Sequence, residues 1–538
     1  MPSARPPLPP VRLRPDAELA RAALAAPVLA RAVRLARWAG PGRPAGAGGE
    51  LADAELAAAV EVLGLAGHED GAARTRRAWR VALGTGLVAV HEGLPEAGAG
   101  GDGAAGCGGG AGAATTAAGA GPGGADGAGA GGGADAGAGG ADMAGPGGPG
   151  AADRAGAGGV TVAAGEALPL VTRGGPRDVL GLWSDALEAV CAETPAPAGR
   201  RGAPRAGAAG PDPRAEAAFL DEVLAALYLL TVSENGAGGP GGGPVPLPAL
   251  AASVIVPDGM GEPTDDVLEQ VSGAMTRLDG RFRALAETGL VEYRPVDRAL
   301  LADDAPEEPE PGELDQDDVA RYGMVRLTPL GLYGMRRRLS ASGVSAPAVG
   351  DLAGRGAGEL LAAVGGYPPE AARAETERWL AGREPLDAAR ALLAAAKGAD
   401  TGSPLRRLHC QQALALVGDG AEPAVREVLD DPELGGLARV WLAERGAADV
   451  PPPPEPMVFW LAVDTIAAQL DADGDLDALR DLVEGLAGRH GGFFDQVWRV
   501  EHPSTPEVLE AMGRLHRDRR IAKDARKAAF KARSRVGA

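Results

Sequence analysis

The stretch WRVALGTGLVAV, residues 79–90, decides the fold, because a similar stretch recurs near the middle of the chain. Without gaps and offset by 203 positions, it aligns on FRALAETGLVEY, residues 282–293, with five of twelve positions identical. Each copy predicts a helix with an aromatic core residue, a glycine able to take the left-handed conformation at the helix end, and a short strand. The chain therefore contains two copies of one small folding unit.

Both copies resume after an insertion with a second strand, residues 160–162 in the first and 324–327 in the second. Helix, strand, hairpin and strand together indicate a winged helix. In the second copy the strand runs directly into Leu327-Thr328-Pro329-Leu330-Gly331. Thr328 can cap a helix and Pro329 suits its first turn, so we expect another helix over 329–341.

The run from Gly289 to Leu339 resembles the winged-helix family of MarR-like transcription regulators, in which a V-x-L-T-P-x-G element closes the wing and opens the next helix. The resemblance covers about 120 residues of the second copy and, through the repeat, a weaker region of the first. It implies a DNA-binding type of module. It carries over neither a ligand nor an operator.

Glycine and proline, 84 and 45 of 538 residues, exclude one compact core and concentrate in breaks between helical patterns. Residues 98–159 hold 28 of the glycines and too few large apolar side chains to offset the entropy of ordering. We therefore expect the organisation listed here: a first winged-helix module over 1–97 plus 160–194, a disordered Gly/Ala-rich insertion at 98–159, a linker at 195–214, a second module over 215–345 with an acidic insertion at 302–319, and a helical domain over 346–538.

Strand signals stop at about residue 350, and helix follows helix, for example over 404–417, 421–430, 456–470 and 519–534. Two helix pairs, at 422–442 and 502–532, look like HEAT-type repeats. Short antiparallel helices of this kind bury their apolar stripes by stacking on neighbours. The predicted fold class is thus mainly α: two winged-helix modules followed by a HEAT-like α-solenoid.

The helix over 72–84 carries the first candidate binding residues. With Trp79 and Leu83 toward the core, a rotation of 100° per residue predicts an exposed arginine arc, and the second copy offers a similar set. In a winged helix this helix enters the major groove, where arginine contacts phosphates or guanine edges. The nucleic-acid-binding candidates are Arg74, Arg77, Arg80, Arg277, Arg281 and Arg283. The competing interpretation is a solvated arginine face, because 49 arginines against four lysines suggest a GC-rich genome of the actinobacterial type.

The acidic insertion argues against DNA, because residues 302–319 hold nine carboxylates and no base where a wing tip is expected. The segment is interpreted as a solubilising linker, or as a lid that competes for the arginine face.

The stretch from Arg514 to Arg535 has ten Arg or Lys residues against Asp518 and Asp524. Phe530 and Ile521, with interspersed alanines, predict an apolar side, so one interpretation is a capping helix with a solvated basic face. The other is an electrostatic handle for nucleic acid or an acidic partner, including the 302–319 segment. The candidate handle residues are Arg519, Arg520, Lys523, Arg526, Lys527 and Lys531.

Enzyme signals are weak. No lysine precedes Ser or Thr, so a Walker A loop is absent, and neither HExxH nor GxSxG occurs. The six histidines and three cysteines lack metal-ligand or disulfide spacing. We expect no enzyme, no cofactor and no metal. Without an apolar leader or a spanning run, we also expect a cytoplasmic protein that does not contact membranes.

Two functions remain open. The first is a DNA-associated regulator, in which the arginine arcs contact double-stranded DNA and residues 350–538 bind a protein partner. The alternative is a non-catalytic protein–protein scaffold whose winged helices do not touch DNA, as in the acidic tandem winged-helix subunits of bacterial chromosome-condensation complexes. The net charge of −20 and the interrupted wings favour the scaffold, whereas fold analogy and the repeated arginines favour DNA.

Overall fold

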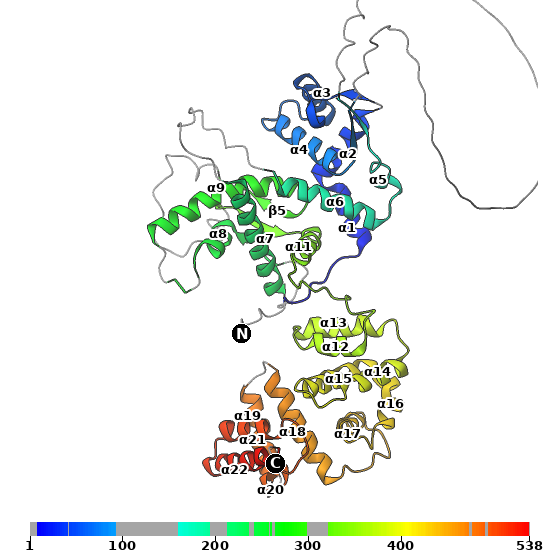
Figure 1. The fold of residues 1–538 in the computed structure, drawn as a ribbon, viewed down its shortest axis with the longest axis vertical. Coiled ribbons are helices and arrows are strands. Elements are labelled where there is room, and N and C mark those ends of the chain that lie inside the picture. The colour runs from blue at the N-terminus through cyan, green and yellow to red at the C-terminus, as the bar shows by residue number, and fades with distance from the viewer. Residues whose placement is uncertain are drawn as a thin grey trace, which may run out of the picture.

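The computed structural model describes residues 8–40, 42–92, 160–193, 212–235, 242–257, 259–260, 264–297, 321–472, 476–489 and 493–536. The expected Gly/Ala-rich insertion at 98–159, the acidic insertion at 302–319 and the 195–214 linker up to residue 211 lie outside these residues. The described chain is mainly helical, with two small sheets. Figure 1 shows a blue-to-green part that holds both sheets and a yellow-to-red part built from helices.

The first part of the chain places one three-stranded antiparallel sheet against helices. Its strand order is β1-β3-β2, so the strand that follows the long insertion lies in the middle. Its elements are α1 (Asp16–Ala25), α2 (Pro27–Ala39), β1 (Arg43–Pro44), α3 (Asp53–Leu63), α4 (Gly71–Gly84), β2 (Val88–Glu92) and β3 (Val160–Ala164), followed by α5 (Leu170–Arg173) and α6 (Pro176–Cys191).

The second copy repeats this arrangement. Its strand order is β4-β6-β5, which corresponds strand for strand to the first sheet. Its elements are α7 (Pro213–Asn235), β4 (Val245–Pro246), α8 (Leu247–Ile255), α9 (Asp265–Thr288), β5 (Val291–Arg294), β6 (Met324–Leu327) and α11 (Pro329–Ala341). The two-stranded hairpin expected after each repeated helix is therefore present in both copies.

The residues that predicted the repeat act as expected. Gly86 and Gly289, which are equivalent in the alignment, have φ of 68° and 75°, a left-handed conformation that favours glycine. Thr328 caps α11 by accepting a hydrogen bond from the Gly331 amide at 2.8 Å. A Cβ on Gly331 would lie 1.9 Å from the Leu290 carbonyl oxygen, so only glycine fits there.

The two copies share one hydrophobic core, which runs from Val11 to Ala348. Trp183 of α6 is fully buried between them, and its indole nitrogen donates a hydrogen bond to the Thr288 carbonyl of α9 at 2.7 Å. Backbone bonds from Val11 to residues 347 and 349 join the beginning of this unit to its end. The copies are thus halves of a single packed unit.

The remaining helices form an array with two cores. One core spans residues 357–442 and the other 459–532. Successive contacts link α12 to α14, α14 to α15, α15 to α18, α18 to α21 and α21 to α22. The helices are α12 (Ala357–Val364), α13 (Pro369–Leu380), α14 (Pro385–Ala396), α15 (Ser403–Val417), α16 (Glu422–Glu427), α17 (Gly435–Glu444), α18 (Glu455–Asp471), α19 (Leu476–Arg489), α20 (Phe493–Val497), α21 (Thr505–Leu515) and α22 (Arg519–Val536).

Apolar spacing in the sequence predicts one helix over 16–39 and a break in the helix over 264–287, and both predictions were wrong. The first helix divides at Ala26, whose extended backbone precedes Pro27, because the residue before a proline disfavours the helical region. In the second case α9 runs without interruption. The short edge strands β1 and β4 are additional, since two-residue strands carry no alternation pattern.

Candidate interaction sites

The arginines of α4 pair with carboxylates from both copies. Arg77 lies between two carboxylates, with its Nε 2.8 Å from Glu193 and its Nη1 3.4 Å from Glu287. Arg80 pairs with Glu193 at 2.5 Å, and Arg74 pairs with Glu287 at 3.3 Å. Glu193 follows α6 and Glu287 lies in the last turn of α9, and their side chains are only 11% and 14% exposed. These pairs therefore lie at the junction between the two copies.

The arginines of α9 are also engaged. Arg281 is buried, and its guanidinium donates to the Glu193 carbonyl oxygen; burial lowers its pKa, opposed by the charges of Glu216 and Glu193. Arg277 pairs with Glu216 at 3.3 Å. Arg283 bonds Asp279 at 2.8 Å, and this hydrogen bond raises the pKa of Arg283.

The expectation of an outward arginine arc holds only in part, because Arg281 is buried and the Arg77 side chain is 21% exposed, whereas those of Arg80, Arg277 and Arg283 are 56%, 46% and 43% exposed. Arg74, Arg77, Arg80 and Arg281 contact the same pair of glutamates, and Arg277 and Arg283 pair with carboxylates of α7 and α9. A rotation of 100° per residue gives the direction of a side chain but not what packs against it. Glu193 from the end of the first copy and Glu287 from the second are both far from α4 in the sequence, and both lie beside its arginines.

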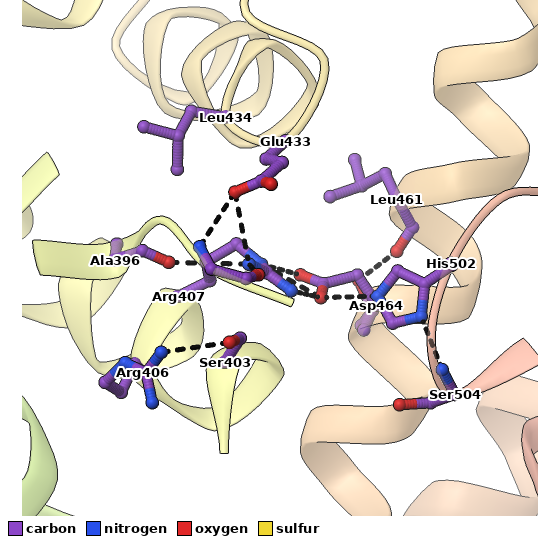
Figure 2. Close-up of polar contacts among 12 residues, drawn as sticks. Ala396, Ser403, Arg406, Arg407, Glu433, Leu434, Leu461, Asp464, His502 and Ser504 are labelled. Atoms are coloured by element: carbon purple, nitrogen blue, oxygen red, sulfur yellow. Dashed lines mark hydrogen bonds and ion pairs between the residues drawn. The ribbon is translucent and has the colours of Figure 1, made fainter. Parts of the chain in front are cut away.

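Figure 2 shows a buried polar network inside the array. Arg407 of α15 donates from Nε and Nη2 to the Asp464 carboxylate of α18 at 2.6–3.0 Å, and its Nη1 donates to the Gly398 carbonyl at 3.0 Å. His502 lies on the other side of Asp464, with Nε2 3.1 Å from Oδ1. Its Nδ1 accepts from the Ser504 amide, which leaves Nε2 as the donor.

This network joins the two cores of the array. Arg407 and Asp464 have side chains only 2% and 6% exposed, and His502 is also buried. Trp460 covers the network, with its ring 4.9 Å from the Arg407 guanidinium carbon and 4.8 Å from the His502 ring centroid. The ion pair is buried and its hydrogen-bonding groups have partners, so it fixes how α15, α18 and the loop before α21 meet. We infer that the network positions the two cores of the array.

The basic handle residues lie together on the exposed side of α22. Arg519, Arg520, Lys523, Arg526, Lys527 and Lys531 are all exposed. The opposite side of the helix is formed by buried alanines. The expectation for Phe530 was wrong, because its side belongs to the basic stripe and the residue is 73% exposed. The alanines of α22 pack in the same core as Val508, Leu509 and Met512 of α21.

Comparison with known proteins finds no matching family model, no matching curated protein and no matching solved structure. Within the described ranges, no group of three or more His, Cys, Asp or Glu side chains is placed to hold a metal ion. Among the described helices, none combines the length and apolar character needed to cross a bilayer. The function must therefore be inferred from the chain itself.

The sequence identifies the arginines of the site but not the residues that pair with them. Glu193 and Glu287 carry no motif, and they become important because α6 and α9 bring them to α4. Asp464 and His502 are 38 residues apart and meet through the packing of α18 on the loop before α21. One signal was available: an acidic residue within the apolar run of α18 is the kind that persists when it is paired.

Proposed function

We propose that this protein is a non-catalytic adaptor in which two winged-helix modules pack into one unit, followed by a HEAT-like array that binds a protein partner. The common strand order of the two sheets and the position of α4 and α9 before each hairpin support the winged-helix assignment. The observation that carries the adaptor function is the position of Arg77 between Glu193 and Glu287.

The charge balance at this junction disfavours duplex DNA. In a regulator, the arginines of the helix before the wing must be free to meet phosphates. Here the α4 arginines already have carboxylate partners that are mostly buried, and exposing them to DNA would separate these charge pairs. The binding free energy for a duplex would be reduced by that loss.

A groove on the second module offers a surface for a protein partner in addition to the array. Phe219 of α7 and Ile255 of α8 contribute its apolar surface, and Asp266 and Glu269 of α9 add negative charge. Arg277 of α9 also lines the groove and pairs with Glu216 at 3.3 Å. An open groove with an apolar wall and carboxylates fits a basic, amphipathic segment of another protein.

The experiment that tests the adaptor measures duplex binding by the full chain. Arg74, Arg77 and Arg80 are changed together to alanine, and the affinity for a random-sequence DNA duplex is measured by fluorescence anisotropy at two salt concentrations. We expect the affinity of the variant to stay within about twofold of the parent at both. A regulator would instead lose about 0.9 in the salt slope for each phosphate contact removed.

The matched control changes three arginines of the array, Arg355, Arg373 and Arg378, which are all exposed. It removes the same formal charge without touching the junction. If the α4 variant loses duplex affinity and this control does not, the arginines of α4 bind DNA and the adaptor proposal is wrong.

A further inference from the structure

The exposed side of α22 combines charge with an aromatic ring. Phe530 is 73% exposed, the largest exposed fraction among the large hydrophobic residues described. It lies on an open, shallow surface of α22 together with Lys523, Arg526, Lys527 and Lys531, and these five residues are called the α22 stripe. A phenylalanine left in solvent among four cations is costly for the free protein, since a large apolar side chain gains free energy from burial.

The positive charge of this stripe is in excess. At the edges of α22, Arg533 pairs with Glu510 and Arg535 pairs with Glu501. Among the described residues, Lys527 pairs with Asp524 at 3.4 Å, and no ion pair is found for Lys523, Arg526 or Lys531. The cations of this surface therefore outnumber their carboxylate partners, which leaves positive charge for an anionic ligand.

The choice of lysine is unusual for this chain. Three of its four lysines, Lys523, Lys527 and Lys531, occur at intervals of four residues in α22, which also carries five arginines. At 1.5 Å per residue, these intervals place a cation about every 6 Å along one side of the helix. Lysine contacts a phosphate as a compact point charge on a flexible stem, without the fixed fork of arginine.

We propose that the α22 stripe binds single-stranded nucleic acid, with phosphates along the lysines and a base stacked on Phe530. A positively charged surface with an exposed aromatic ring suits such ligands, because every base has a face for stacking. Trp498 borders the stripe, with its ring 5.6 Å from the Lys531 ammonium.

Other ligands fit less well. A bilayer would need an apolar helix face, and the alanine face of α22 is already buried against the array. A duplex would use the cations but leave Phe530 unstacked, because its bases are paired. An acidic peptide would likewise need the charges, but it would not depend on the aromatic ring.

The test uses the full chain and three probes: oligothymidylate, a random duplex and polyglutamate. Phe530→Ala removes the ring, and a second variant changes Lys523, Lys527 and Lys531 to glutamine. The charge-matched control changes Arg355, Arg373 and Arg378 to glutamine. Helicity by circular dichroism verifies that the fold is retained, and all four substituted positions of α22 are exposed.

We expect the parent to bind oligothymidylate more tightly than duplex or polyglutamate. Phe530→Ala should weaken the oligothymidylate complex about tenfold without changing its salt slope. The lysine variant should reduce that slope by about 2, at about 0.7 per phosphate, and the control should leave it unchanged.

Three results would overturn the proposal. They are no binding of oligothymidylate at low salt, equal loss in the control, and a Phe530→Ala variant that binds as tightly as the parent. The last result together with tight polyglutamate binding would instead assign the stripe to an acidic protein. Because these variants leave α4 intact, the outcome is independent of the adaptor test.

Discussion

Neutralising Asp464 is the sharpest test of how the array is held together. Asp464→Asn keeps the shape of the side chain and its oxygen acceptor but removes the charge that faces Arg407. The nearest other carboxylate, Glu433, lies 4.0 Å from the Arg407 guanidinium and its side chain is 33% exposed. The substitution therefore leaves a buried guanidinium with a distant and partly solvated counter-charge.

The expected cost follows from this geometry. Removing one partner of a buried ion pair costs about 3–5 kcal/mol. Because Glu433 remains within reach, we expect the lower end of that range, about 3 kcal/mol, for opening of the array. The double variant Arg407→Met with Asp464→Asn has no buried unpaired charge and retains an acceptor for the His502 Nε2–H. Its cost should therefore fall well below the sum of the two single substitutions.

The assay is native-state hydrogen exchange read by mass spectrometry, because a chain with several cores need not unfold in one step. A loss of about 3 kcal/mol corresponds to exchange about 150-fold faster in peptides from α15 and α18. Peptides from α7 and α9 belong to the other core and serve as internal controls. A double-mutant cycle with a coupling below about 0.5 kcal/mol would refute the reasoning, since it would show independent residues.

Three further outcomes are expected. Gly334→Ala should destabilise the two-module unit by about 1–3 kcal/mol in thermal unfolding, because its Cβ would lie 2.6 Å from the Trp183 ring; an unchanged Tm would contradict this packing. Burial lowers the pKa of His409 from its ordinary 6.5, so the unfolded chain binds the extra proton first and stability falls as pH drops below about 6.5. His409→Gln should flatten that part of the pH profile, and an identical profile would exclude the effect. Burial also raises the pKa of Cys191 to about 11 and of Cys410 to about 12. A thiol reagent at about pH 8 should therefore label both cysteines slowly until urea is added, as measured by peptide mass spectrometry. Rapid labelling of the native protein would show that these thiols are accessible.

The repeat could be predicted because its signals are local. Trp79 and Phe282 are both buried, as their place in the aligned helices required, and Thr328 and Gly331 form the expected start of α11. Aromatic core positions, left-handed glycines and caps act over a few residues. Because these interactions join residues that are close in the sequence, they can be predicted without the tertiary structure.

The candidate site was predicted less well. All six arginines were found, but their surroundings were not, because Glu193 and Glu287 reach α4 only when α6 and α9 pack beside it. Phe530 was placed on the wrong side of α22 for a similar reason. The alanines packed against α21 decide which side of that helix is buried, and periodicity does not report how close the neighbouring helix lies.

The sequence by itself determined the two repeated units, the helical array and the basic stripe of α22. The tertiary structure decided that the two units share one core, that the α4 arginines are paired and that Asp464 holds Arg407 and His502 together. The physical reason is the range of the interactions. Helix capping and periodicity depend on residues within a few positions, whereas burial and ion pairing depend on which distant segments meet.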